Sequence, residues 1–143
     1  MKEMRQMGMY TELDAAFDLP NLTDIDVKII QYMLDEGPEL EESELPNHPL
    51  FKTDRWDFML YSWIYYFRGK PCYVFRYDDI AKTHFLTVRC NLKNYKDEIH
   101  EFLDWIYPKS EHEGFVGYYR YEESDDPTLI YFTDDGIEYK NVA

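Results

Sequence analysis

Apolar and polar residues along the chain alternate in some segments and recur at helical spacing in others, which predicts a mixed α and β fold. Residues 9–18 alternate, with Leu13 and Phe17 among the apolar positions on one face. This period of two is typical of a half-buried strand. Residues 21–35 and 94–107 instead place apolar side chains three and four positions apart. They predict two helices, each with one buried stripe.

Cap and turn residues mark the ends of both helices. Thr23 is followed three positions later by Asp26, which resembles a capping box with a short acid. Gly37 stands where a helix of this kind commonly ends. Asn94 is the expected cap of the second helix, and Pro108 ends it.

The remaining strands are predicted from β-rich segments. Residues 56–67 form a continuous apolar and aromatic run. Such a run fits either a buried helix or a strand, and its Tyr, Trp and Ile content favours a central strand. The other expected strands are 72–77 and 83–90, joined around Asp78-Asp79, then 115–121 and 129–132, with a short strand at 137–140 as an option.

The predicted order is therefore β-α-β-β-β-α-β-β. Hairpins dominate this order, so the sheet should be mainly antiparallel. Two helices cannot cover both faces of so wide a sheet, and the expected fold class is an α+β two-layer sandwich with both helices on one face. We expect a single domain over residues 1–143, with residues 1–8 flexible and residues 36–50 forming an acidic loop.

Composition adds a strong negative charge to this picture. The 143 residues include 29 Asp and Glu against 15 Lys and Arg, a formal net charge of −14, while aromatic residues make up 18 % of the chain. Dense aromatics favour a folded core despite the charge. The charge argues against direct, non-specific nucleic-acid binding, which needs clustered Lys and Arg. No apolar run is long enough to predict a membrane span, so we expect a cytoplasmic protein.

The acids are concentrated in two segments that contain no Lys or Arg, residues 35–46 and 122–138. Residues 52–96 show the opposite bias, with nine bases against four acids. One interpretation is solubility, because acidic loops are well solvated. The other is a docking surface that imitates nucleic acid and is steered onto a basic partner. The candidate partner-binding residues are Glu39, Glu41, Glu42, Glu44, Glu122, Glu123, Asp125 and Asp126.

The predicted hairpin of residues 72–90 could carry an aromatic face. If its turn sets Tyr77 opposite Phe85, the aromatic residues share one face with Arg89, and Cys72 lies beside Cys90 on the other. Such a face suits an oligomer interface, a stacking platform for bases or a peptide, or a surface covered by loops. The two cysteines are then either small buried hydrophobic residues or a redox pair. The candidate ligand-binding residues are Tyr73, Phe75, Tyr77, Arg76 and Arg89.

Catalytic motifs are not apparent in the sequence. It contains no G-x-S-x-G, P-loop, G-x-G-x-x-G or H-E-x-x-H pattern. We therefore expect no catalytic residues, no metal site and no cofactor. A hydrolase using Asp78, Asp79 and His84 stays as a third class of function, because these residues form one of the few groupings of His with acids.

Several motifs resemble a group of small uncharacterised phage and prophage proteins. They are Met7-Gly8-Met9-Tyr10-Thr11-Glu12-Leu13, Leu92-Lys93-Asn94-Tyr95, Phe102-Leu103-Asp104-Trp105-Ile106, Tyr65-Tyr66-Phe67 and Pro127-Thr128-Leu129-Ile130-Tyr131. The likeness spans most of the chain and implies a viral origin. It also implies a host-takeover or counter-defence role, as in anti-CRISPR proteins. No catalytic residue is among the motifs, so the likeness assigns no site.

Two functions are expected from these observations. The first is a non-enzymatic phage protein that inhibits a host protein, for instance a nucleic-acid-binding one, through its acidic surfaces. The second is an oligomeric protein that binds a small ligand or signalling nucleotide on the aromatic face, with bases stacked on tyrosines and phosphate held by arginine.

Overall fold

A computed structural model of the chain describes residues 10–61, 72–111 and 113–142. The strands are β1 (Thr11–Leu19), β2 (Cys72–Asp78), β3 (Thr83–Leu92), β4 (Gly114–Tyr121), β5 (Thr128–Thr133) and β6 (Gly136–Asn141). The helices are α2 (Asp24–Met33) and α3 (Glu98–Ile106), with short 3-10 turns η1 (Glu42–Glu44), η2 (Pro49–Lys52), η3 (Trp56–Phe58) and η4 (Tyr107–Lys109).

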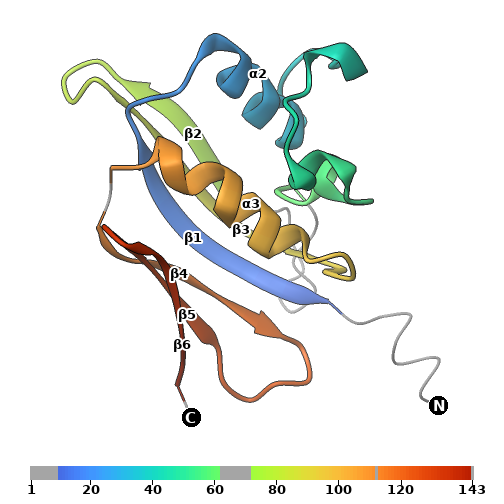
Figure 1. Cartoon of the computed structure of the whole chain (residues 1–143), viewed down its shortest axis with the longest axis vertical. Helices are drawn as coiled ribbons and strands as arrows, with labels where there is room; N and C mark the ends of the chain where they lie inside the picture. Colours follow the sequence, from blue (N-terminus) through green and yellow to red (C-terminus); the bar gives the residue numbers. More distant parts are fainter. Residues whose placement is uncertain (1–9, 62–71, 112, 143) are drawn as a thin grey trace.

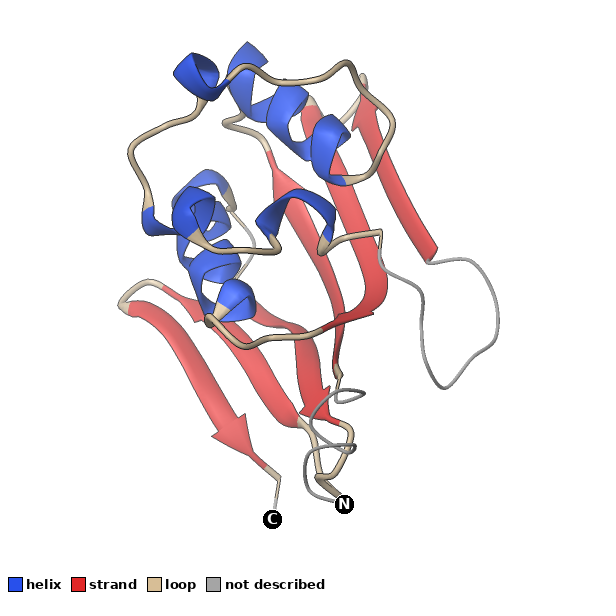
Figure 2. Cartoon of the chain, turned by 90° about the vertical axis from the view of Figure 1, so that its right-hand side faces the viewer, coloured by secondary structure: helices blue, strands red, loops and turns tan. Residues whose placement is uncertain are grey.

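The six strands form one sheet in the order β2-β3-β1-β4-β5-β6, and each neighbouring pair is antiparallel. The first strand therefore lies inside the sheet, between β3 and β4. Both helices pack on the same face of this sheet (Figures 1 and 2). The expected α+β fold class is confirmed.

The prediction of a strand at residues 56–67 is wrong for residues 56–61, the part of this segment that the structure describes. Trp56 opens the 3-10 turn η3, and the chain continues as turn to residue 61. The Trp56 ring packs edge-on to Phe51 at 4.9 Å between ring centroids, while Met59 and Leu60 are fully buried. These apolar residues fill the helix layer and not the sheet. Residues 62–67 lie outside the described part of the chain.

The sixth strand comes instead from β6, which the sequence indicated only as a short option at 137–140. The order of the main elements is thus β-α-β-β-α-β-β-β. The acidic loop expected at 36–50 is more structured than predicted, because η1 and part of η2 fall inside it. The expectation for residues 1–8 falls outside the described residues.

The core lies between the sheet and the two helices. Phe17 of β1 stands at its centre, 6.0 Å from the ring of Phe102 on α3 and 5.7 Å from that of Phe132 on β5. All three rings are at most 2 % exposed. Burying one such side chain contributes about 1.5–3 kcal/mol. Ile29 and Met33 extend the same cluster from α2.

The capping box at the start of α2 forms as the sequence predicts. The Asp26 amide donates to the Thr23 hydroxyl at 3.2 Å, and the Thr23 amide donates to the Asp26 carboxylate at 3.0 Å. At α3, the Asn94 side chain accepts a hydrogen bond from the Ile99 amide at 3.0 Å, although the helix itself begins at Glu98. Among the described residues, no helix has the length and apolar character that crossing a membrane requires.

Candidate functional site

The register of the β2–β3 hairpin decides which residues share a face. Tyr77 lies opposite His84, and the pairing ends at Asp78 opposite Thr83. The predicted pairing of Tyr77 with Phe85 is therefore wrong by one residue. A slip of one position moves every side chain of a strand to the other face of the sheet.

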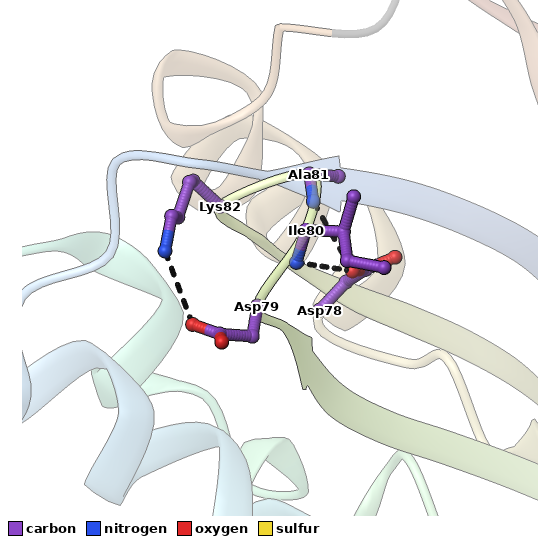
Figure 3. A network of polar contacts seen from close by, with 5 residues as sticks. All are labelled: Asp78, Asp79, Ile80, Ala81 and Lys82. Atoms are coloured by element: carbon purple, nitrogen blue, oxygen red, sulfur yellow. Dashed lines mark hydrogen bonds and ion pairs between the residues drawn. The ribbon is translucent and has the colours of Figure 1, made fainter.

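A four-residue turn at 79–82 sets this register. The Asp78 carboxylate accepts hydrogen bonds from the amides of Ile80 at 2.9 Å and Ala81 at 3.1 Å (Figure 3). Lys82 adopts a left-handed conformation with φ of 57°, and its ammonium reaches the Asp79 carboxylate at 3.1 Å. The Asp78 carboxylate thus fixes the backbone of the turn, and Asp79 adds an exposed ion pair.

The corrected register separates the five candidate ligand-binding residues. Tyr73 and Phe75 pack against the core on the helix side, and Tyr77 lies on the same side with its ring 5.0 Å from that of His84. Arg76 and Arg89 belong to the opposite face. The stacking platform that combined these aromatic rings with an arginine is not assembled, so the nucleotide-binding alternative loses its geometric basis.

The two cysteines are not cross-strand neighbours, which corrects a second expectation from the same register. Cys72 lies opposite Arg89, whereas Cys90 pairs with Leu13 of β1. The Cys90 side chain is fully buried, and this burial raises the pKa of its thiol. Cys90 is therefore a packed core residue with an unreactive thiol.

The histidines of the described chain contact aromatic rings. His84 stacks on Phe75 at 5.3 Å, and burial lowers the pKa of its imidazole. His100 lies 4.8 Å from the ring of Tyr139. Across residues 10–61, 72–111 and 113–142, no three His, Cys, Asp or Glu side chains are grouped so that they could hold a metal ion. The strand register places Asp78 and His84 on opposite faces of the sheet, so the grouping of Asp78, Asp79 and His84 is not assembled.

The first acidic segment forms an anchored loop beside α2. Glu44 is tied down, because its carboxylate lies 2.6 Å from the Lys28 ammonium and also accepts from the Glu41 amide at 3.1 Å. The hydrogen bond from Lys28 lowers the pKa of Glu44. Glu39, Glu41 and Glu42 are exposed. We call these three residues the upper acidic loop.

The acids of the second acidic segment lie partly before β5, at residues 122–126, and partly after it, at residues 134–138. Glu122 is structural, since its carboxylate accepts from the Tyr10 amide at 2.6 Å and its own amide donates to the Tyr10 carbonyl at 2.9 Å. Glu123, Asp125 and Asp126 are exposed in the β4–β5 turn, and we call them the lower acidic loop. The upper and lower acidic loops lie at opposite ends of the long axis of the molecule (Figure 1).

The face of the sheet turned away from the helices is covered by no described helix, and we call it the open face. Two ion pairs cross it: Asp14–Arg89, at 3.4 Å, and Glu12–Arg120, at 3.0 Å. The strand pairings place the following residues on it: Glu12, Asp14, Ala16, Asp18, Val74, Arg76, Asp78, Thr83, Phe85, Thr87, Arg89, Asn91, Phe115, Tyr118, Arg120, Leu129, Tyr131, Glu138 and Lys140.

A hollow of about 420 Å³ lies in the middle of the open face, over β1, β3 and β4. Its floor is low because Ala16, Thr87 and Gly117 are small, and the rings of Phe85 and Phe115 stand at its sides. Gly117 is required here, since a Cβ at this position would lie 2.1 Å from the Asp14 carbonyl oxygen. A β-bulge between Phe115 and Gly117 shifts the β4–β5 register at the same place.

Sequence reasoning missed this hollow and its aromatic rim. The bulge disrupts the alternation of β4, so the faces of residues 115–118 could not be assigned from the pattern. The isolated Gly117 inside a strand was the available signal, because such glycines often mark a bulge or a close approach.

Comparisons with protein-family models, with curated proteins and with solved structures find no match for this chain.

Proposed function

We propose that this protein is a phage-encoded, non-enzymatic binding protein that acts in the host cytoplasm and inhibits a host protein by docking on a basic surface of it. The resemblance to small phage proteins supports the origin. The exposed carboxylates support a basic partner, such as the groove of a nucleic-acid-binding protein that the acids would occupy in place of phosphates.

The observation that carries this proposal is the anchored state of the upper acidic loop. Its three carboxylates are exposed, yet the Glu41 backbone amide is held by the Glu44 carboxylate, which is itself paired with Lys28. A loop that is held in place before binding loses less conformational entropy on docking than a flexible loop does. A solubility coat does not require such anchoring.

A contact at one end of the molecule is more economical than one using both acidic loops. The upper and lower loops lie at opposite ends of the long axis (Figure 1), so a partner that docks on one end of the molecule contacts only one of them. We assign the docking role to the upper loop because Glu44 and Lys28 anchor it. The lower loop then serves as an internal control of equal charge.

The test compares two triple charge reversals. The first is Glu39→Lys, Glu41→Lys and Glu42→Lys, and the second is Glu123→Lys, Asp125→Lys and Asp126→Lys. Each variant changes the formal charge by the same amount, so a site effect can be told from a bulk charge effect. The partner is captured from bacterial lysate by the wild-type chain and identified, and the affinity of the purified pair is then titrated at several salt concentrations.

The first variant should weaken the affinity by at least about 30-fold and flatten its salt dependence, because three charge contacts are reversed. The second should stay within about threefold of wild type, since only long-range screened charge changes. Equal losses of affinity in both variants would mean that net charge, and not the upper acidic loop, determines binding. If the first variant bound with the affinity of the wild type, the upper acidic loop would not be part of the interface.

A further inference from the structure

The open face is close to neutral, although the whole chain is strongly acidic. Its acids are Glu12, Asp14, Asp18, Asp78 and Glu138, and its bases are Arg76, Arg89, Arg120 and Lys140, so its formal charge is −1. The whole chain carries −14. Two copies that approach through other surfaces meet like charge, whereas two open faces meet with little net repulsion.

Five of the charged residues on this face already have partners within one copy. Asp14 pairs with Arg89, and Glu12 with Arg120. Lys140 lies over the Tyr131 ring, 4.5 Å from its centroid. An anionic ligand or a strongly charged partner would have to displace these internal partners. An occupant that is nearly neutral and partly apolar does not have to displace them, and a second open face is such an occupant.

The open face carries an exposed aromatic ring beside a hollow. Phe115 is 51 % exposed and stands beside the hollow floored by Ala16 and Gly117. In a two-fold interface a residue that contacts a site on the partner receives the reciprocal contact. One Phe115 ring can therefore enter the hollow of the partner copy while the partner's Phe115 enters the first hollow. Tyr118 and Tyr131 flank this contact, and tyrosine is enriched in interface centres.

The size of the face matches the lower end of stable interfaces. Six strands about 4.8 Å apart, with about seven residues each at about 3.3 Å per residue, span roughly 550 Å² of flat area. Side chains make the accessible area larger than this footprint, and a standard interface buries about 800 Å² per partner. Val74, 48 % exposed, adds apolar area on β2, near one edge of the face.

From these observations we infer that two copies of this chain associate through their open faces to form a symmetric four-layer dimer. The two sheets pack face to face in the middle, and the helix layers lie outside. Both acidic loops stay accessible, since they lie at the ends of the molecule and not on the open face (Figure 1). The inferred dimer is therefore independent of the proposed docking function, and each can be tested without the other.

Sedimentation equilibrium of the full chain over a range of concentrations tests the dimer. The wild type should show a concentration-dependent rise from 17.4 kDa to twice that mass. Phe115→Asp should raise the dimer dissociation constant by at least about 30-fold, as expected for loss of a central anchor. Thr87→Arg, which fills the hollow from an exposed position, should do the same and covers the case in which Phe115→Asp fails to fold.

Tyr77→Asp is the matched control, because Tyr77 is 52 % exposed, also in a strand, but on the helix side of the sheet. This variant should dimerise like the wild type. A wild type that stays monomeric at high concentration overturns the inference. A dimer that survives both Phe115→Asp and Thr87→Arg overturns it as well, since that dimer would form through edge strand β2 or β6.

Discussion

Asp14 and Arg89 lie opposite each other on β1 and β3, with the carboxylate Oδ2 3.4 Å from the guanidinium Nε, in the middle of the sheet face that the helices leave open. This pairing neutralises the centre of the open face from within one copy. It also puts an ionised carboxylate where solvent is reduced. Burial raises the pKa of Asp14, Arg89 lowers it, and the nearby Glu12 raises it again, with burial the largest effect.

The raised pKa of Asp14 gives a signed pH prediction. A carboxyl whose pKa is higher in the folded state contributes stability at low pH and loses it as pH rises through the window above its ordinary value of 3.8. Asp14→Asn cannot ionise, so the stability of the wild type relative to this variant should fall as pH rises from below 3.8 through the raised pKa of Asp14. Urea denaturation at several pH values measures this difference. A difference that grows with pH would mean that Arg89 outweighs burial.

Gly117 should be intolerant of any side chain. A Cβ there would lie 2.1 Å from the Asp14 carbonyl oxygen and 2.6 Å from the Ala15 Cα, both rigid backbone of the central strand. Gly117→Ala should lower the free energy of unfolding by at least ~3 kcal/mol. Gly114→Ala is the control, because Gly114 also has positive φ but no atom within 4 Å of its Cβ position. That variant should lose only ~1–2 kcal/mol from backbone strain, and equal losses would refute the clash.

Lys82 should be replaceable by glycine with a gain in stability. Its φ of 57° places an ordinary residue in the left-handed region, which costs roughly 1–2 kcal/mol. The ion pair with Asp79 is exposed, and such pairs contribute little. Lys82→Gly should raise the free energy of unfolding by about 0.5–1 kcal/mol after the entropy cost of glycine. Lys82→Ala keeps the backbone strain and should not raise the free energy of unfolding. If both variants raised it, backbone strain at Lys82 would not be the cause.

Cys90 should be chemically silent in the folded protein. Its side chain is fully buried, and its thiol pKa is raised by burial. In a Cys72→Ser background, iodoacetamide should modify Cys90 at least about 100-fold more slowly in buffer than in concentrated urea. Mass spectrometry over time gives both rates. Similar rates in the two solvents would show that the strand pairing around Cys90 opens readily.

Local sequence signals predicted the elements whose causes are local. The Thr23 and Asp26 capping box needs only four consecutive residues, and it forms as expected. The alternation of β1 also holds, because Leu13, Ala15, Phe17 and Leu19 all face the core. In both cases the pattern and the physical reason lie within one segment.

The errors arose where distant contacts decide the outcome. Trp56 packs against Phe51 and Tyr32, and Met59 and Leu60 are fully buried, which no property of the segment itself reveals. The register of β2–β3 depends on the left-handed Lys82, a conformation that lysine rarely adopts. With this register Tyr73, Phe75 and Tyr77 lie on the helix side of the sheet, whereas Arg76 and Arg89 lie on the open face.

The most direct test of the dimer through the open face is an isotope-filtered NOE experiment on a mixture of labelled and unlabelled full-length chain. The filter retains only contacts between copies. We predict an intermolecular NOE between the Phe115 ring and the Ala16 methyl group, lost in Thr87→Arg and kept in Tyr77→Asp. The dimer would be contradicted by the absence of any such contact at concentrations where sedimentation shows association, or by contacts confined to β2 or β6.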